Sequence, residues 1–268
     1  LGGSLLWHRA VIERARVVIV EICDKLPYAY GEHCCIHRGE IDYIIEGNDL
    51  PCAELPSAPP SDVDKAVGRL IAAEIESGSC LQIGIGGMPN AVCSLLQHSD
   101  AGDFGIQTEM LTDGIIDLYK AGKITGAKKQ LDPGKSVYTF ALGSQYLYDT
   151  IDRNPDGHRH ISGTGGQLQF VRGAYASEGG KSFICLASTY ERQGNRKSRV
   201  VLNLTEGNIV TAPRSDMMYV VTEYGIVNLK GKSAAERAVA LISIAHPDYR
   251  EQLEREARDN RLIPKGYG

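Results

Sequence analysis

The sequence has few Trp and Phe residues and no excess of basic residues. Its 268 residues include one Trp and four Phe, and 29 Lys and Arg stand against 33 Asp and Glu, a net charge of -4. Without a basic excess the chain cannot neutralise many phosphates, so duplex nucleic acid is not expected as a partner. Hydrophobic residues make up 43% and charged residues 23%, fractions that indicate a globular protein and argue against disorder.

Long apolar segments and paired cysteine motifs are also missing. No apolar run approaches the roughly twenty residues that a membrane helix needs, so no membrane partner is expected. The seven cysteines are an odd number without CxxC spacing, which favours reduced thiols buried as small hydrophobes and a cytoplasmic location. Residues 1–6 lack an initiator Met and a signal-peptide pattern, and we expect the chain to begin inside a domain.

Several ligand-binding motifs are incomplete. Gly-Lys-Ser occurs at 134–136, 180–182 and 231–233, but none of these has the Gly that a P-loop requires five residues upstream. Residues 33–37, His-Cys-Cys-Ile-His, contain metal-ligating residue types, yet no second Cys/His pair completes a set of four ligands. No metal site is therefore expected, and the basic loop 192–199 is interpreted as a solvated hairpin turn.

Apolar runs alternate with helical patterns and glycine-rich turns, and the proline-dense stretch 55–62 is the expected linker. This alternation predicts an α/β fold with mostly parallel sheets, in which ligands bind outside the carboxyl ends of the strands. Strands are expected at 16–22, 41–45, 81–85, 104–108, 136–142, 182–187, 199–204 and 217–222. Helices are expected at 63–75, through about Gln97, at 113–121, at 233–245 and from Pro247 onward, with capping boxes at Ser61 and Ser233.

Two glycine-rich segments and one glutamate stand at expected strand ends. Residues 82–90 would place free backbone N–H groups at a helix N-terminus, which stabilises anions and developing oxyanions. Glu109 ends an apolar strand and would be partly desolvated, so it is expected to be either paired or functional. Residues 162–173 could supply further N–H donors. From the residues alone, tight structural turns and a surface glutamate remain open alternatives.

These segments resemble the 4-hydroxybutyrate, butyryl and acetyl-CoA transferase branch of the family I CoA-transferases. The resemblance lies, in this order, in HRGEIDYIIEGNDLPCAELP, LQIGIGGMPNAV, GIQTEMLTDGIIDL, SGTGGQLQFVRGAYASEGGKSFICL and VTEYGIVNLKGKSAAERAVALISIAHPDYR. It implies two open α/β domains with mostly parallel sheets, the N-terminal one only partly represented. Residues 1–60 would be the remnant of that domain plus the linker, and residues 61–268 the C-terminal catalytic domain. A family segment near residues 155–157 would be absent.

By the same resemblance, Glu109 is the nucleophile that attacks the acyl-CoA carbonyl and then carries CoA as a glutamyl thioester. Glu223, another glutamate at an expected strand end, is the rival nucleophile; family position favours Glu109, and Glu223 is assigned a structural or supporting role. No role follows for Arg214 or His246. The residues that match CoA-contacting positions of the family are Gly86, Gly87, Met88, Pro89, Asn90 and, in a second loop, Gly166.

The implied function is the transfer of CoA between a short-chain acyl-CoA and a free carboxylate, with CoA as a substrate and no permanently bound cofactor. An acyl-CoA hydrolase that uses the same glutamate, and a non-catalytic scaffold subunit, remain alternatives. The resemblance also implies a cytoplasmic homodimer. The sequence does not identify the acyl group.

Overall fold

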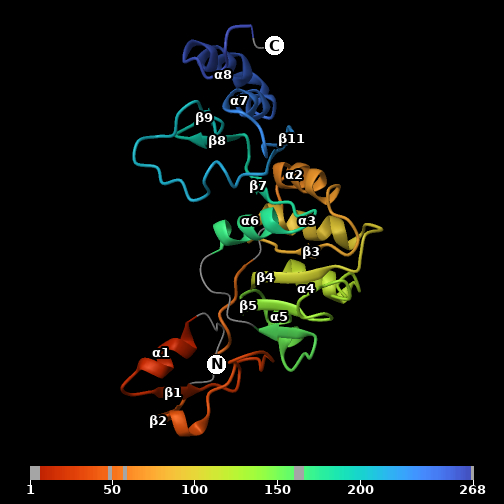
Figure 1. The fold of residues 1–268 in the computed structure, drawn as a ribbon. Helices are drawn as coiled ribbons and strands as arrows, with labels where there is room; N and C mark the ends of the chain where they lie inside the picture. Colours follow the sequence, from red (N-terminus) through yellow and green to blue (C-terminus); the bar gives the residue numbers. More distant parts are fainter. Residues whose placement is uncertain (1–6, 48–49, 57–58, 160–165, 267–268) are drawn as a thin grey trace. The chain divides into compact units, whose positions relative to one another are not determined.

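The computed structural model describes residues 7–47, 50–56, 59–159 and 166–266 (Figure 1). It divides into two compact units, one formed by Leu1–Pro59 and Ile75–Thr164 and the other by Pro60–Glu74 and Gly165–Gly268. The second unit thus includes helix α2 (Asp62–Ala72), which packs on strands β10 (Tyr219–Thr222) and β11 (Gly225–Asn228). The predicted domain boundary between residues 60 and 61 stays a prediction, because the two compact units are groups of residues that pack together and are not continuous stretches of sequence.

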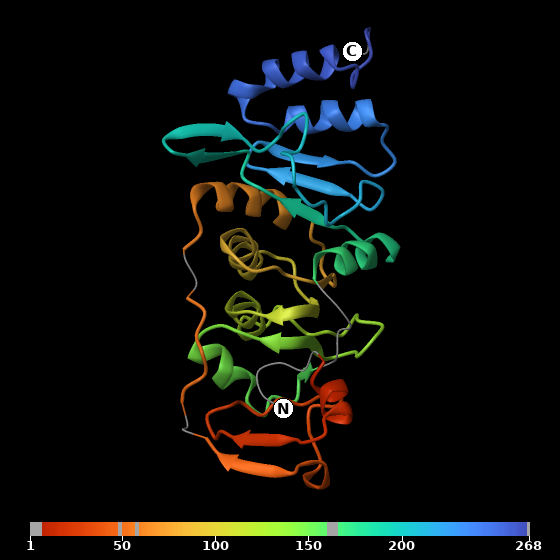
Figure 2. The same cartoon turned by 90° about the vertical axis from the view of Figure 1, so that its left-hand side faces the viewer.

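The first unit is built on a parallel four-stranded sheet in the order β3-β4-β5-β6. Helices follow the first three strands, and the whole layer runs from gold to green in Figures 1 and 2. Its core contains fully buried Phe104, Ile106, Leu118 and Leu147. The elements are β3 (Cys80–Leu81), α3 (Gly87–Gln97), β4 (Gly105–Leu111), α4 (Asp113–Lys120), β5 (Ser136–Ala141), α5 (Gln145–Ile151) and β6 (Gly157–Arg159).

The amino-terminal part of this unit forms a separate parallel pair. Ile19 of β1 pairs with Tyr43 of β2, and all four residues of β2 are exposed. Two hydrogen bonds attach the following segment to the four-stranded layer: Tyr148 donates its hydroxyl to the Ala53 carbonyl at 2.6 Å, and Leu55 N–H donates to the Gly143 carbonyl at 3.1 Å. The elements here are α1 (His8–Arg14), β1 (Ile19–Ile22), the 3-10 helix η1 (Arg38–Glu40) and β2 (Tyr43–Glu46).

The second unit has a three-stranded sheet in the order β11-β10-β7, with β7 (Phe183–Cys185) parallel to β10 and β11 antiparallel to it. Three helices complete it, α6 (Gln167–Ala176), α7 (Ala234–Ser243) and α8 (Pro247–Asp259). The capping boxes predicted at Ser61 and Ser233 are both confirmed. The mostly parallel α/β fold is therefore the predicted one.

Two predicted strands differ from the structure, and one predicted turn agrees with it. The expected strand 199–204 was wrong, because Val201 and Leu204 are exposed to solvent and no neighbouring strand pairs with them. Strand β3 is shorter than predicted and ends at Leu81, before the glycines begin. The basic loop does form a hairpin, between β8 (Thr189–Arg192) and β9 (Asn195–Ser198), and the positive φ angles of Gln193 and Gly194 form its turn.

All seven cysteines are free thiols, but their burial is only partly as predicted. Cys34 and Cys93 are buried, whereas Cys35 and Cys80 are exposed. No group of three or more His, Cys, Asp or Glu side chains within the described ranges is arranged to hold a metal ion. Across those same ranges, no helix is long and apolar enough to cross a membrane.

Candidate active site

Glu109 lies inside strand β4, two residues before its end, and not at the strand terminus as predicted. The strand alternates: Ile106, Thr108 and Met110 on one face are buried, whereas Gln107 and Glu109 on the other face are exposed and half-buried. The Glu109 carboxylate has no hydrogen-bond or ion-pair partner among the described residues. A half-buried carboxylate without a partner is available for chemistry.

The loop after β3 leads directly into helix α3. Gly86 is the N-cap residue and has a φ of +123°, a left-handed conformation that favours glycine. A Cβ atom there would meet nothing within 4 Å, so the backbone conformation and not the space demands the glycine. No described residue accepts a hydrogen bond from the N–H groups of Gly87 and Met88. These two donors at the positive end of the helix dipole could bind an anion.

Two contacts hold this loop and helix against β4 and α4. The Thr108 hydroxyl, on the buried face of β4, contacts the Ile83 carbonyl at 3.5 Å and donates to the Met110 carbonyl at 3.2 Å. At the start of α4, a Cβ atom on Gly114 would lie 3.1 Å from Cys93 Cβ and 3.4 Å from Asn90 Oδ1. Gly114 therefore permits the close packing of α4 on α3 beside Asn90. Sequence reasoning missed both Thr108 and Gly114.

Asp113, the first residue of α4, holds the turn between β5 and α5 in place. Its carboxylate accepts the Ser144 N–H at 3.1 Å and the Ser144 hydroxyl at 2.8 Å, which links the start of α4 to the turn between β5 and α5. One helical turn later, burial raises the pKa of the Asp117 carboxyl, and the charge of Asp113 adds to that shift. Burial likewise raises the pKa of the Cys93 thiol to about 12, which makes this thiol unreactive at neutral pH.

Glu223 has the structural environment that was predicted for it. The residue follows β10 in the second unit, and its carboxylate accepts hydrogen bonds from the N–H and the hydroxyl of Ser188, at 2.9 and 2.6 Å. Ser188 is completely buried. The carboxylate is thus already occupied by two donors.

Gly166 belongs to the second unit and is the N-cap of α6, where its carbonyl accepts the Phe170 N–H at 3.3 Å. Residues 162–165 of the predicted second loop lie outside the described residues. Gly86 to Asn90 and Glu109 therefore belong to the first unit and Gly166 to the second. The assignment of Gly166 to CoA binding stays a prediction.

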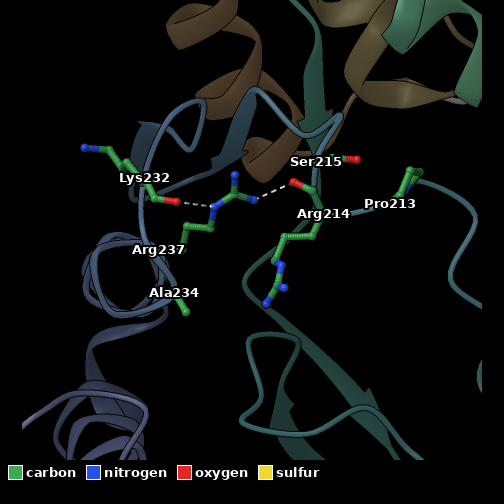
Figure 3. A pocket seen from close by; sticks show the side chains of 6 residues that line it. All are labelled: Pro213, Arg214, Ser215, Lys232, Ala234 and Arg237. Atoms are coloured by element: carbon green, nitrogen blue, oxygen red, sulfur yellow. Dashed lines mark hydrogen bonds between the residues drawn. The ribbon is translucent and has the colours of Figure 1, made fainter.

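A cavity of about 480 Å³ in the second unit is lined by basic side chains (Figure 3). Arg237 spans it, with Nε donating to the Lys232 carbonyl at 3.0 Å and Nη1 to the Arg214 carbonyl at 2.6 Å. The side chains of Arg214 and Lys232 point away from the Arg237 guanidinium and from each other. The three positive charges therefore do not converge on one point. We interpret Arg237 as a residue that holds two backbone carbonyls and not as part of a ligand site.

The chain is similar to known proteins along nearly its whole length. A family model described as the acetyl-CoA hydrolase/transferase C-terminal domain matches residues 147–257. The chain is 44% identical to a protein of Syntrophomonas wolfei named a probable butyrate:acetyl-CoA coenzyme A-transferase, covering 98% of this chain and 68% of that protein. It is 43% identical to the butyryl-CoA:acetate CoA-transferase of Anaerostipes caccae, covering 97% of this chain and 68% of the relative.

A solved structure shares the fold. The crystal structure of 4-hydroxybutyrate CoA-transferase from Porphyromonas gingivalis superposes with a TM-score of 0.85 at 36% identity, covering 97% of this chain and 70% of that one. The alignment with the Syntrophomonas protein spans 306 residues although this chain has 268, so that relative carries residues without a counterpart here. The predicted position of such a gap, near residues 155–157, stays a prediction.

Proposed function

The chain belongs to the acetyl-CoA hydrolase/transferase family, and from this premise we propose that it transfers CoA from a short-chain acyl-CoA to a free carboxylate, with Glu109 as the nucleophile. The observation that carries the proposal is the identity of 43–44%, over nearly the whole chain, to proteins named as butyrate CoA-transferases. The half-buried carboxylate of Glu109, on a strand of a parallel sheet and without a partner among the described residues, adds a residue suited to that chemistry.

The glutamyl-CoA thioester forms in two displacement steps. A Glu109 oxygen attacks the acyl carbon of the thioester, the C–S bond breaks, and CoA leaves as a thiolate, which produces a mixed anhydride. The thiolate then attacks the glutamyl carbon of this anhydride and releases the acyl group as a free carboxylate. Glu109 is left as a glutamyl-CoA thioester. An incoming carboxylate runs the two steps in reverse and leaves as the new acyl-CoA, so no proton or electron is consumed.

The loop at 86–90 would bind CoA and stabilise the negative charge that develops in these steps. The free N–H groups of Gly87 and Met88 are held at the start of α3, and such fixed donors need no reorganisation during the reaction. Removing one donor of this kind typically slows a reaction by about 10²–10³-fold. We assign Pro89, Asn90 and Gly166 to CoA contacts on the resemblance alone, with CoA as a substrate and no permanent cofactor.

The proposal also covers the oligomeric state of the protein and its place in the cell. We propose a homodimer in the cytoplasm, from the resemblance to the family and from the unpaired thiols. Sedimentation analysis of the purified protein tests the first point, and cell fractionation tests the second.

The decisive experiment is the intact mass of the protein before and after incubation with butyryl-CoA. We expect a CoA-sized mass increase in the wild type and none in Glu109→Gln. Glu223→Gln is the matched control, since it replaces the other strand-end glutamate and should retain the adduct. An adduct that persists in Glu109→Gln would contradict the assignment of the nucleophile.

The acceptor requirement separates the transferase from its alternatives. A transferase releases CoA or a new acyl-CoA from the adduct only when a carboxylate such as acetate is added, whereas a hydrolase releases CoA into plain buffer. A folded protein that binds CoA and forms no adduct would instead be a non-catalytic scaffold.

A further inference from the structure

Three buried side-chain hydroxyls in the described part of the chain have no hydrogen-bond partner: those of Thr112, Thr139 and Ser182. Thr139 is the most enclosed of them, with 1% of its surface exposed, and it lies in the middle of β5. A buried hydroxyl without a partner is unfavourable, and native proteins rarely keep one without a reason.

The register of the sheet places this hydroxyl beside Glu109. Strands β4 and β5 are parallel, and the pairs on either side are Thr108 with Tyr138 and Met110 with Phe140. Glu109 and Thr139 are the residues between these pairs, so they are neighbours across the two strands. Paired residues of parallel strands extend from the same face of the sheet, and the strands are about 4.8 Å apart. The two side chains do not touch through a hydrogen bond in the structure, but at this spacing a rotation about their side-chain bonds brings a hydroxyl and a carboxylate within hydrogen-bond distance.

We propose that Thr139 is a positioning residue for Glu109: its hydroxyl, which has no partner in the described structure, turns to donate a hydrogen bond to one carboxylate oxygen when Glu109 reacts and leaves the other oxygen free to attack. The proposal rests on the function proposed for Glu109. It gives a reason for a buried hydroxyl without a partner on this strand, since the neighbouring Glu109 carboxylate also has no partner among the described residues.

The oxygen held by Thr139 would keep its place throughout the reaction. The attacking oxygen forms the anhydride and departs with the released acid, whereas the second oxygen stays on the glutamyl carbon. That second oxygen becomes the carbonyl oxygen of the glutamyl-CoA thioester, and it carries negative charge whenever a thiolate or carboxylate attacks the glutamyl carbon. A donor fixed beside it would favour each of these attacks.

The competing explanation is that Thr139 is present only for its β-branched shape. Threonine and valine have nearly the same volume and both suit a buried strand, so valine would then serve equally well. The two explanations differ in what Thr139→Val does to chemistry and to stability.

The test compares the wild type with Thr139→Val and Thr139→Ser, using the rate of CoA-adduct formation from butyryl-CoA, kcat and KM for transfer to acetate, and the thermal unfolding midpoint. Thr139→Val should unfold at the same temperature or higher, because the Thr139 hydroxyl makes no hydrogen bond in the described structure, while adduct formation slows by about 10–10²-fold. The loss should fall on kcat with KM for butyryl-CoA little changed. Thr139→Ser should restore the rate to within a few-fold of the wild type.

Two control variants make the result interpretable. Ser182→Ala removes another unpartnered buried hydroxyl, at the amino end of β7, and should leave the adduct rate unchanged. Thr222→Val removes a buried hydroxyl that donates to the Ile244 carbonyl at 2.6 Å, and should lower the unfolding midpoint. An unchanged adduct rate in Thr139→Val, or a drop in its unfolding midpoint as large as that of Thr222→Val, would overturn the proposal. An adduct that persists in Glu109→Gln would instead contradict the nucleophile assignment itself.

Discussion

Glu223 accepts two hydrogen bonds from Ser188, one from the backbone N–H at 2.9 Å and one from the hydroxyl at 2.6 Å. This pair joins the end of β10 to the segment that follows β7, and Ser188 is completely buried. Glu109, on β4, has no such partner in the described part of the chain. The two glutamates that look alike in sequence therefore differ in what surrounds them, and only one has its carboxylate free.

Breaking the Glu223–Ser188 pair should affect folding and spare the chemistry. In Glu223→Gln the charge-assisted bonds become weaker or are lost, and we expect the free energy of unfolding to fall by about 1–3 kcal/mol. Urea unfolding measures the loss, and Ser188→Ala should act in the same direction. A Glu223→Gln protein that is as stable as the wild type but forms no CoA adduct would show that Glu223 takes part in the reaction.

Gly86 and Gly114 should respond differently to alanine. At Gly86 the φ of +123° is unfavourable for any residue with a Cβ, although the space is open, so Gly86→Ala should cost about 1–3 kcal/mol and weaken CoA binding by reorienting the N–H groups of α3. At Gly114 the added Cβ would press on Cys93 at 3.1 Å. Calorimetric titration with CoA and thermal unfolding of both variants check this. Equal CoA affinity in Gly86→Ala and the wild type would remove the loop from the proposed binding site.

Cys93 should make the protein less stable in alkali. Its pKa is about 12 in the folded state because of burial, against an ordinary value near 9 in the unfolded chain. Below pH 9 the thiol is protonated in both states, so the full stability is present. Above pH 9 the unfolded chain loses the proton first, and stability falls as the pH rises towards 12, by up to about 1.4 kcal/mol per pH unit.

The measurement for Cys93 is urea unfolding between pH 8 and pH 10.5 for the wild type and Cys93→Ala. Other groups titrate in this range, so the difference between the two slopes is the informative quantity. The wild type should have the steeper fall. Parallel slopes would mean that the thiol is not desolvated in the folded protein.

Arg237 should stabilise the second unit through its two backbone acceptors. In Arg237→Lys the charge remains, but one ammonium group cannot reproduce the fork that contacts the Lys232 and Arg214 carbonyls, so the free energy of unfolding should fall by about 1–3 kcal/mol. Arg214→Lys is the control and should change stability by no more than about 0.5 kcal/mol, because its side chain points away from that contact. Similar losses in both variants would indicate a general charge effect.

Much of the fold could be predicted because it depends on local patterns. The capping boxes at Ser61 and Ser233 each involve residues three positions apart, and helices α3 and α4 begin and end close to where the pattern of apolar residues predicts. The failure at 199–204 has the opposite cause. A run of apolar residues becomes a strand only where a neighbouring strand and a cover are available, and neither is present there.

The sequence by itself determined many of the helices and strands, the glycine at position 86 and the candidacy of Glu109, since each depends on the chemistry of a few adjacent residues. Only the tertiary structure shows that the Glu223 carboxylate is occupied by Ser188 and that Glu109 has no partner among the described residues, because both depend on residues far away in the chain. The same holds for Thr139, which is an ordinary strand residue in sequence. It becomes a candidate partner of Glu109 only through the register of β5 against β4, which long-range pairing sets and no local pattern encodes.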